Sequence, residues 1–286
     1  MHRAHRLRRG SSLVVAIVVA VTAATSLTAC EPAADTYVAM GDSFVSGPLI
    51  PSQSGGGCMR SSRNYPNVAR TKIKATKFTD ISCSGAKVDD FFNANGNNPP
   101  QLSALNNDTK IVTVGISGND IGFTEIIKTC ALQEPWGSGC KGDYVKNGRD
   151  ELSERITVTG PRLAVALAYV KQKAPRAKIF VTGYPTVLPA TGSGCYPAVP
   201  ILPVDVKYLR SKFLELNSMI KSRTQAAGGT YIDLATPSVG HDFCALDKWV
   251  EGIVPLAVAA PVHPNQKGMA AFGNVVATEI NKVVTK

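Results

Sequence analysis

Short apolar segments alternate with longer helix-like segments along almost all of the chain after residue 35. Strands that alternate with helices favour a parallel sheet with helices on both faces, which is an α/β fold of three layers. The 286 residues are enough for one large domain of this kind, expected over residues 36–286. Strands are predicted at residues 37–40, 77–82, 111–115, 177–182 and 231–234, and helices at 65–75, 151–173, 205–227 and 265–284, with one more after Asn119.

Residues 1–29 have the pattern of an export signal. Four arginines and no acid precede an apolar run from Leu13 to about Ala24, and small residues follow. The run is short for a membrane span, which needs about 20 apolar residues. Leu27-Thr28-Ala29-Cys30 resembles a lipobox, so cleavage before Cys30 would leave 30–35 as a linker and anchor the protein by a lipid on the outer face of the cell membrane. A plain secretory signal, with full release of the protein, is the alternative.

The composition excludes two classes of protein. Apolar residues make up 44% of the chain and charged residues 18%, a balance typical of a globular protein rather than a disordered one. Loss of the signal removes four of 31 basic residues and none of the 21 acids, so the net charge falls from +10 to 27 − 21 = +6. No dense basic run or aromatic stripe is present, and nucleic-acid binding is therefore not expected.

The cysteines favour an oxidising compartment. There are seven, and acylation of Cys30 would leave six, the even number that a disulfide framework needs. Six cysteines allow 15 pairings. Zinc binding is the alternative, but the chain has no Cys-x-x-Cys pair. Sequential pairing is expected, since each bond would then close a loop-rich stretch: Cys58–Cys83, Cys130–Cys140 and Cys195–Cys244.

Four polar or glycine positions follow strands or open a helix. Ser43 lies just after the first strand, Gly85 after the second and Asn119 after the third, while His263 opens the last helix. In open parallel sheets the site forms at the carboxyl ends of the strands. These four positions are therefore expected to meet at one edge of the sheet.

Serine is a poor nucleophile unless a base lies within hydrogen-bond reach. Once the signal is removed, only His241 and His263 remain as histidines. His263 precedes a proline at a helix start, whereas His241 lies in a stretch that a disulfide is expected to hold. The sequence therefore predicts Ser43 as nucleophile and His263 as its base, with His241 structural.

Four sequence blocks carry a family resemblance. They are Gly41-Asp42-Ser43, Ser84-Gly85-Ala86, Gly118-Asn119-Asp120 and His263-Pro264-Asn265. In this order, across the mature chain, they resemble the SGNH, or GDSL-type, hydrolases, and the chain is similar to their secreted actinobacterial branch with three disulfides. The resemblance implies a flavodoxin-like sheet of about five strands, and we expect a monomer without metal or cofactor. The Gly-x-Ser-x-Gly run of ordinary α/β-hydrolases is absent from the sequence.

The resemblance also implies an oxyanion hole. Its donors would be the backbone N–H groups of Ser43 and Gly85 and the side-chain amide of Asn119. Asp42 is read as holding the turn. One departure from the family pattern is Ser117, which stands where many members have glycine.

A second departure concerns the group that orients His263. Many members carry an aspartate three residues before the histidine, and this chain has Ala260 there. Our hypothesis is a Ser43–His263 dyad completed by a backbone carbonyl, that of Ala260. The competing hypothesis is a carboxylate from Asp242, Asp247 or Glu251.

These features predict an exported serine hydrolase of carboxylic esters, an esterase, lipase or phospholipase-like enzyme. Its substrate would be a small-molecule or lipid ester. Two alternatives stay open: a carbohydrate O-acetyl esterase with the same machinery, and a non-catalytic, lipid-anchored binding protein. Residues 49–51, 184–185 and 197–203 are candidates for an acyl site, although each fits loop packing equally well.

Overall fold

The computed structural model describes residue 2 and residues 35–284. Apart from residue 2, the predicted signal lies outside the described residues, as do Cys30 and all but the last residue of the linker 30–35. Within the described part of the chain, no helix is both long enough and apolar enough to cross a membrane.

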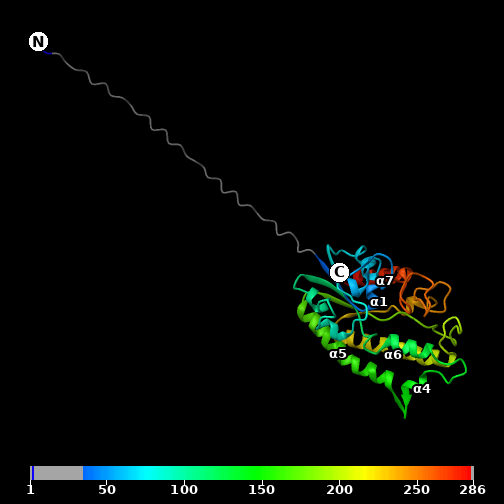
Figure 1. Ribbon diagram of the computed structural model, residues 1–286. Helices are drawn as coiled ribbons and strands as arrows, with labels where there is room; N and C mark the ends of the chain where they lie inside the picture. Colours follow the sequence, from blue (N-terminus) through cyan, green and yellow to red (C-terminus); the bar gives the residue numbers. More distant parts are fainter. Residues whose placement is uncertain (1, 3–34, 285–286) are drawn as a thin grey trace. The chain divides into compact units, whose positions relative to one another are not determined.

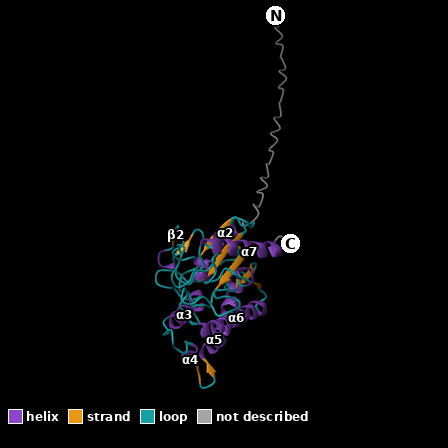
Figure 2. Ribbon diagram, turned by 90° about the vertical axis from the view of Figure 1, so that its right-hand side faces the viewer, coloured by secondary structure: helices purple, strands orange, loops and turns teal. Residues whose placement is uncertain are grey.

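A five-stranded parallel sheet forms the centre of the fold (Figures 1 and 2). Its spatial order β4-β1-β5-β8-β9 corresponds to 2-1-3-4-5 along the chain, the flavodoxin-like order. The predicted α/β fold is therefore confirmed, and the predicted strands agree with the observed ones to within about two residues. The strands are β1 (Thr36–Gly41), β4 (Lys77–Asp80), β5 (Thr109–Gly115), β8 (Lys178–Thr182) and β9 (Thr230–Ile232).

Helices cover both faces of this sheet (Figure 2). One face packs against α5 (Glu151–Lys173) and α6 (Pro203–Ala226), which lie side by side, and the other against α2 (Tyr65–Arg70) and α7 (Gln266–Val284). The remaining elements are α1 (Ser43–Ser46), α3 (Phe123–Ala131), α4 (Lys141–Tyr144), the 3₁₀ turns η1 (Gly56–Cys58), η2 (Val88–Phe91), η3 (Gln101–Ala104) and η4 (Thr236–Ser238), and the strand pairs β2 (Gln53–Ser54) with β3 (Arg60–Ser61) and β6 (Val145–Lys146) with β7 (Arg149–Asp150).

Side chains that point alternately to the two faces of the sheet contribute to two separate hydrophobic cores. In β1, Val38 and Met40 join the core under α5 and α6, while Tyr37 and Ala39 join the core under α2 and α7. Successive side chains of a strand point to opposite faces, so a strand covered on both sides reads as one continuous apolar run.

Pro161 lies inside α5 and does not end it. A proline inside a helix removes one helical hydrogen bond and often kinks or breaks the helix. The helix continues because its buried face extends to both sides of the proline, with Leu152 and Ile156 before it and Leu163 and Leu167 after it.

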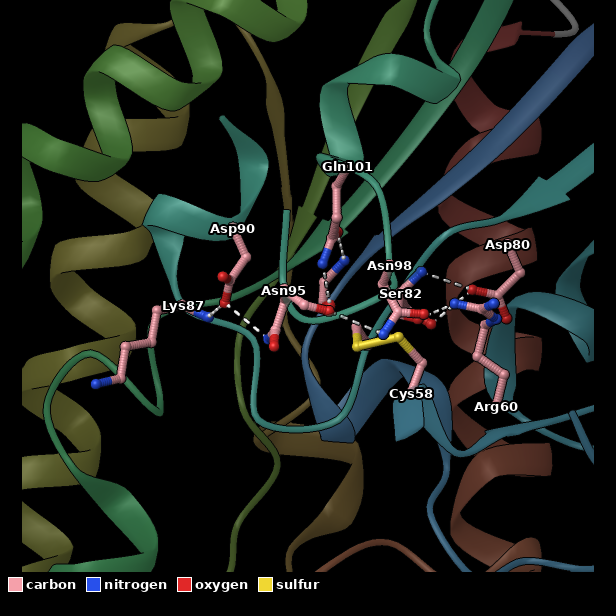
Figure 3. The surroundings of a disulfide bond; sticks show 11 residues. Cys58, Arg60, Asp80, Ser82, Lys87, Asp90, Asn95, Asn98 and Gln101 are labelled. Atoms are coloured by element: carbon pink, nitrogen blue, oxygen red, sulfur yellow. Dashed lines mark hydrogen bonds between the residues drawn. A yellow bond between two sulfur atoms is a disulfide. The ribbon is translucent and has the colours of Figure 1, made fainter. Parts of the chain in front are cut away.

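Three disulfides join the six described cysteines in sequential order, Cys58–Cys83, Cys130–Cys140 and Cys195–Cys244. The first ties the loop after α1 to the end of β4, where Ser84 also donates a backbone hydrogen bond to the Cys58 carbonyl over 3.0 Å. Beside it, Arg60 donates to the Ser82 carbonyl over 2.8 Å (Figure 3). Both links fix the segment that precedes Gly85.

Candidate active site

The carboxyl ends of three neighbouring strands are joined by backbone hydrogen bonds. The N–H of Asp42 donates to the carbonyl of Gly115 over 2.9 Å, which links the ends of β1 and β5. The N–H of Cys83 donates to the carbonyl of Gly41 over 2.9 Å, which links β1 to the segment after β4. The turns that carry Ser43, Gly85 and Asn119 therefore start from one edge of the sheet, as the parallel topology requires.

The turn at Gly41 is tightly enclosed. Gly41 has φ of +145°, and a Cβ at this position would lie 2.2 Å from the carbonyl oxygen of Gly115. The side chain of Gln101 bonds both sides of the same residue, accepting from its N–H over 2.7 Å and donating to its carbonyl over 2.9 Å. Asp42 then caps α1 by accepting the N–H of Phe44 over 2.9 Å. Ser43 thus begins a helix on a fixed turn.

Ser43 and His263 are in hydrogen-bond contact. The Nε2 atom of His263 lies 2.7 Å from Oγ of Ser43, and its Nδ1 atom lies 2.7 Å from the carbonyl oxygen of Pro261. A carbonyl oxygen only accepts, so Nδ1 carries the hydrogen and Nε2 is free to accept from the serine hydroxyl. The ring of Phe44 packs against the imidazole at a centroid distance of 5.0 Å. Both side chains are buried, with His263 9% and Ser43 6% exposed.

The prediction that Ala260 supplies the orienting carbonyl is wrong. The carbonyl of Ala260 accepts the backbone N–H of His263 over 3.3 Å, and Pro261 supplies the oxygen that bonds Nδ1. The cause is Val262, whose φ of +58° turns the chain between the proline and the histidine. A β-branched residue rarely adopts this conformation, which costs about 1–3 kcal/mol and persists only where the surroundings enforce it. Here the Val262 N–H is held by the carbonyl of Gly252 over 3.0 Å.

Among the described residues, no carboxylate hydrogen-bonds to Nδ1 of His263. The three candidates are bound elsewhere: Asp242 accepts the N–H of Cys244, Asp247 pairs with Lys267, and Glu251 accepts from Asn265 and from the N–H of Leu256. His241 stacks on Trp249 at 4.0 Å and bonds the carbonyl of Asp247.

The three predicted oxyanion donors differ in how they are held. Gly85 has φ of +79°, which favours glycine, and no protein atom lies within 4 Å of where its Cβ would be. Within residues 35–284, the backbone N–H groups of Ser43 and Gly85 have no hydrogen-bond acceptor. The amide of Asn119 donates one N–H to the carbonyl of Ala86 over 2.9 Å. An amide has two N–H bonds, so the second one can be offered to a ligand.

Ser117 adopts a conformation suited to the glycine that many family members have there. Its φ is +110°, and its hydroxyl is buried without a hydrogen-bond partner in the described structure. Strain and an unpaired buried hydroxyl both lower stability. A small residue thus fits the position, but it does so at a cost in free energy.

Replacing Ser117 with glycine is expected to raise the free energy of unfolding by about 1–3 kcal/mol, because backbone strain and the unpaired hydroxyl both disappear. The extra freedom of glycine in the unfolded chain offsets about 0.4–1 kcal/mol. Urea unfolding measures the change. Ser82→Gly is the control, since the buried Ser82 hydroxyl bonds Asp80 and its loss should destabilise. Destabilisation by both variants would contradict the strain at Ser117.

A buried contact between Asp42 and Tyr184 extends the site beyond the predicted catalytic residues. Tyr184, just after β8, donates its hydroxyl hydrogen to Asp42 and accepts the N–H of Gly118 over 2.6 Å. Burial raises the pKa of Asp42 to about 7, against the hydrogen bonds from Tyr184 and Phe44, which lower it. The sequence gives no signal for the Asp42–Tyr184 contact, since 142 residues separate the pair.

An apolar groove lies beside the segment that leads into His263. Its volume is about 270 Å³. Pro261 and Val262 form one wall, α3 forms another, and of the three segments considered for an acyl site only 197–203 contributes, through Pro200. Pro51 and Pro185 line other hollows. The α3 wall consists of Thr124, Ile127, Lys128 and Ala131.

Comparison with known proteins agrees with the four sequence blocks. Residues 39–271 match the model of the GDSL-like lipase/acylhydrolase family. The chain is 35% identical to Lipase 2 of Streptomyces coelicolor over 281 residues, 92% of this chain and 93% of that protein. The crystal structures of an extracellular lipase from Streptomyces rimosus and of a phospholipase A1 from Streptomyces albidoflavus match with TM-scores of 0.74 and 0.69, each at 27% identity over 86% of this chain and 99% of the other. The chain therefore belongs to the GDSL-like lipase/acylhydrolase family, the SGNH hydrolases, and is a carboxylic ester hydrolase.

Proposed function

We propose that Ser43 and His263 form a catalytic dyad that hydrolyses carboxylic esters through an acyl-enzyme. The 2.7 Å contact between Ser43 Oγ and His263 Nε2 carries this proposal. His263 takes the hydroxyl proton as Oγ attacks the ester carbonyl, and gives it to the departing alcohol. Water then attacks the acyl group on Ser43, with His263 as base again, and releases the acid.

The carbonyl of Pro261 replaces the usual aspartate in this scheme. It holds His263 in the tautomer that can accept the Ser43 proton, and its partial negative charge stabilises the imidazolium that forms. A neutral acceptor does this less strongly than a carboxylate. The burial of both side chains strengthens the interaction, because the local dielectric constant is low.

The proposed oxyanion hole consists of the N–H groups of Ser43 and Gly85 and the second amide N–H of Asn119. Fixed donors aimed at a developing negative charge are each worth about 2.7–4 kcal/mol in the barrier. Two observations support the assignment: both backbone N–H groups lack a protein acceptor in the described residues, and the contact with Ala86 fixes the Asn119 amide.

The pH profile follows from the burial of His263. Burial lowers the pKa of His263 below its usual value of 6.5, although the hydrogen bond to Pro261 opposes the shift. Only the neutral imidazole can act as base, so the acidic limb of kcat/KM against pH is expected below 6.5. The unfolded chain binds this proton more readily than the folded one, so stability should also fall as pH drops through that range. An acidic limb above pH 6.5 would contradict this assignment.

The groove lined by Pro261 and Val262 favours an ester with a hydrocarbon chain over an acetylated sugar. Its lining is apolar except for Lys128 and Thr124, whereas a sugar needs a dense set of hydrogen-bonding groups. The relatives named lipase and phospholipase A1 support the same choice. We propose that the chain is an esterase or lipase of apolar acyl or alkyl esters.

Hydrolysis rates across a series of acyl chain lengths test this function. Each CH₂ group moved from water into the groove contributes about 0.8 kcal/mol, which is about fourfold in kcat/KM. Ala131→Phe, on the α3 wall, is expected to reduce kcat/KM for long-chain esters and to leave acetyl esters unchanged. Glu125→Phe, on the same helix outside the groove, is the matched control. A flat chain-length profile would contradict the groove assignment, and hydrolysis of no ester at all would contradict the function.

We further propose that the protein is exported as a monomer, with residues 1–29 removed and Cys30 acylated. The three disulfides and the extracellular lipase of Streptomyces rimosus support export. Mass spectrometry of the mature N-terminus distinguishes an acylated Cys30 from a released chain, and Cys30→Ala should move the protein from the membrane fraction to the medium.

A further inference from the structure

We infer that Tyr184 is a positioning residue that holds the Asn119 turn against the Ser43 turn. The inference rests on the proposed oxyanion hole and adds a residue from a fourth strand end to it. The hydroxyl of Tyr184 contacts the residues that precede two of the three donors: Asp42 precedes Ser43, and Gly118 precedes Asn119.

Gly118, Tyr184 and Asp42 form a hydrogen-bonded bridge, and the groups involved fix the direction of each hydrogen bond in it. The N–H of Gly118 can only donate, so the Tyr184 oxygen accepts it over 2.6 Å. The phenolic hydrogen is then left for a carboxylate oxygen of Asp42, while the other carboxylate oxygen accepts the N–H of Phe44 over 2.9 Å. Each hydrogen bond thus has one direction. The bridge runs from the Asn119 turn through the tyrosine to the cap of the Ser43 helix.

The bridge is also shielded and closely packed. Asp42 is 1% exposed and Tyr184 4% exposed, so water cannot easily replace either partner. A Cβ on Gly118 would lie 2.8 Å from the tyrosine oxygen, so the turn approaches the hydroxyl as only glycine allows. The ring of Phe44 meets the Tyr184 ring edge-on, at a centroid distance of 5.1 Å.

Asn217, on α6, holds the backbone of Tyr184 through two hydrogen bonds, here called the Asn217 clamp. The side-chain amide of Asn217, on α6, accepts the N–H of Tyr184 over 2.8 Å and donates to its carbonyl over 2.9 Å. The hydroxyl therefore projects from a rigid base. Gly118 and Asp42 sit on separate strand ends, so their common partner links the two turns that carry oxyanion donors, beyond the hydrogen bond from Asp42 to Gly115 at the strand ends themselves.

Loss of the hydroxyl should affect the transition state more than substrate binding. A displacement of about 1 Å between catalytic groups can cost about 10²-fold in rate. Tyr184→Phe is therefore expected to lower kcat by about 10–100-fold, with KM changed by less than about twofold, since a group that acts only in the transition state leaves KM unaltered. Tyr208→Phe is the matched control: its buried hydroxyl also donates to a carboxylate, that of Asp150, away from the site.

A double-mutant cycle with Asn119→Ala tests whether Tyr184 acts through the oxyanion donor. Residues that act as one unit give non-additive effects. In the Asn119→Ala background, Tyr184→Phe should cost less than about threefold in kcat, while in the wild-type background it costs the full amount. Equal losses in both backgrounds, or no loss in the wild type, would overturn the inference. If Asn119→Ala instead kept the kcat of the wild type, the proposed oxyanion hole would be wrong, and the inference with it.

Folding of each variant is checked by its thermal transition and by retention of the far-ultraviolet circular dichroism of the wild type. If Tyr184→Phe does not fold, Asn217→Ala takes its place in the cycle, since it loosens the clamp and keeps the hydroxyl. The same kcat loss and the same non-additivity with Asn119→Ala are then expected. An Asn217→Ala variant that is fully active, or additive with Asn119→Ala, would overturn the inference.

Discussion

Replacing Ser43 with alanine is expected to lower kcat by about 10⁶-fold, the loss seen when a serine hydrolase loses its nucleophile. Without Oγ no acyl-enzyme forms, and only electrostatic stabilisation by the oxyanion donors remains. A residual acceleration of about 10³–10⁴ over water is therefore expected. Steady-state hydrolysis of a short-chain chromogenic ester measures the change. His263→Ala should cost about as much, and the double variant no more than either single one.

Two matched controls separate catalysis from folding in that experiment. Ser46 lies three residues after Ser43 on the same short helix, and its buried hydroxyl has no partner in the described structure, so Ser46→Ala should keep full activity. His241 packs on Trp249 instead of on Ser43, and His241→Ala should likewise retain activity. Equal hydrolysis by Ser43→Ala and wild type would contradict Ser43 as the nucleophile.

The sheet and the pairing of Ser43 with His263 could be predicted from sequence for the same physical reason. Buried parallel strands read as continuous apolar runs, and their carboxyl ends share one edge. Once β1 is located by residues 37–40, the position of Ser43 follows. With a single plausible histidine, three residues before α7, its partner follows too.

The carbonyl group that hydrogen-bonds Nδ1 of His263 could not be predicted in this way. Whether Ala260 or Pro261 presents its carbonyl depends on one backbone angle, the φ of Val262. Valine is among the residues least expected at positive φ, so sequence gives the opposite indication. The turn adopts this angle because the hydrogen bond from Val262 to Gly252 holds it, and that contact exists only in the folded chain.

Gln101 and the hydrogen-bonding role of Tyr184 were missed for a different reason. Each meets the nucleophile turn through a side-chain contact with a residue far away in sequence, 142 residues for Tyr184 and 60 for Gln101. Neither lies in a motif with a fixed spacing from Ser43. The strand order brings Tyr184 to the site, because β8 lies beside β5 and its carboxyl end lies at the same edge.

Replacing Gly41 with alanine is expected to destabilise the fold by more than about 4 kcal/mol, a large part of the roughly 5–15 kcal/mol that stabilises a typical domain. The new Cβ would lie 2.2 Å from the carbonyl oxygen of Gly115 and 2.5 Å from the side chain of Val45. The turn cannot move away easily, since Gln101 bonds both the N–H and the carbonyl of Gly41. To relieve this overlap, β1 would have to move away from β5. The hydrogen bonds between these two strands fix the turn that carries Ser43, so that turn would move as well.

Urea unfolding of Gly41→Ala and of Gly148→Ala separates overlap from backbone strain. Gly148 also has positive φ, +78°, but no atom lies within 4 Å of where its Cβ would be. Its substitution should cost only the intrinsic penalty of a left-handed residue, about 1–2 kcal/mol. The difference between the two variants then measures the close approach of β1 to β5. Equal losses would mean that the Gly41 turn relaxes freely, and the fixed geometry ascribed to the Ser43 turn would be wrong.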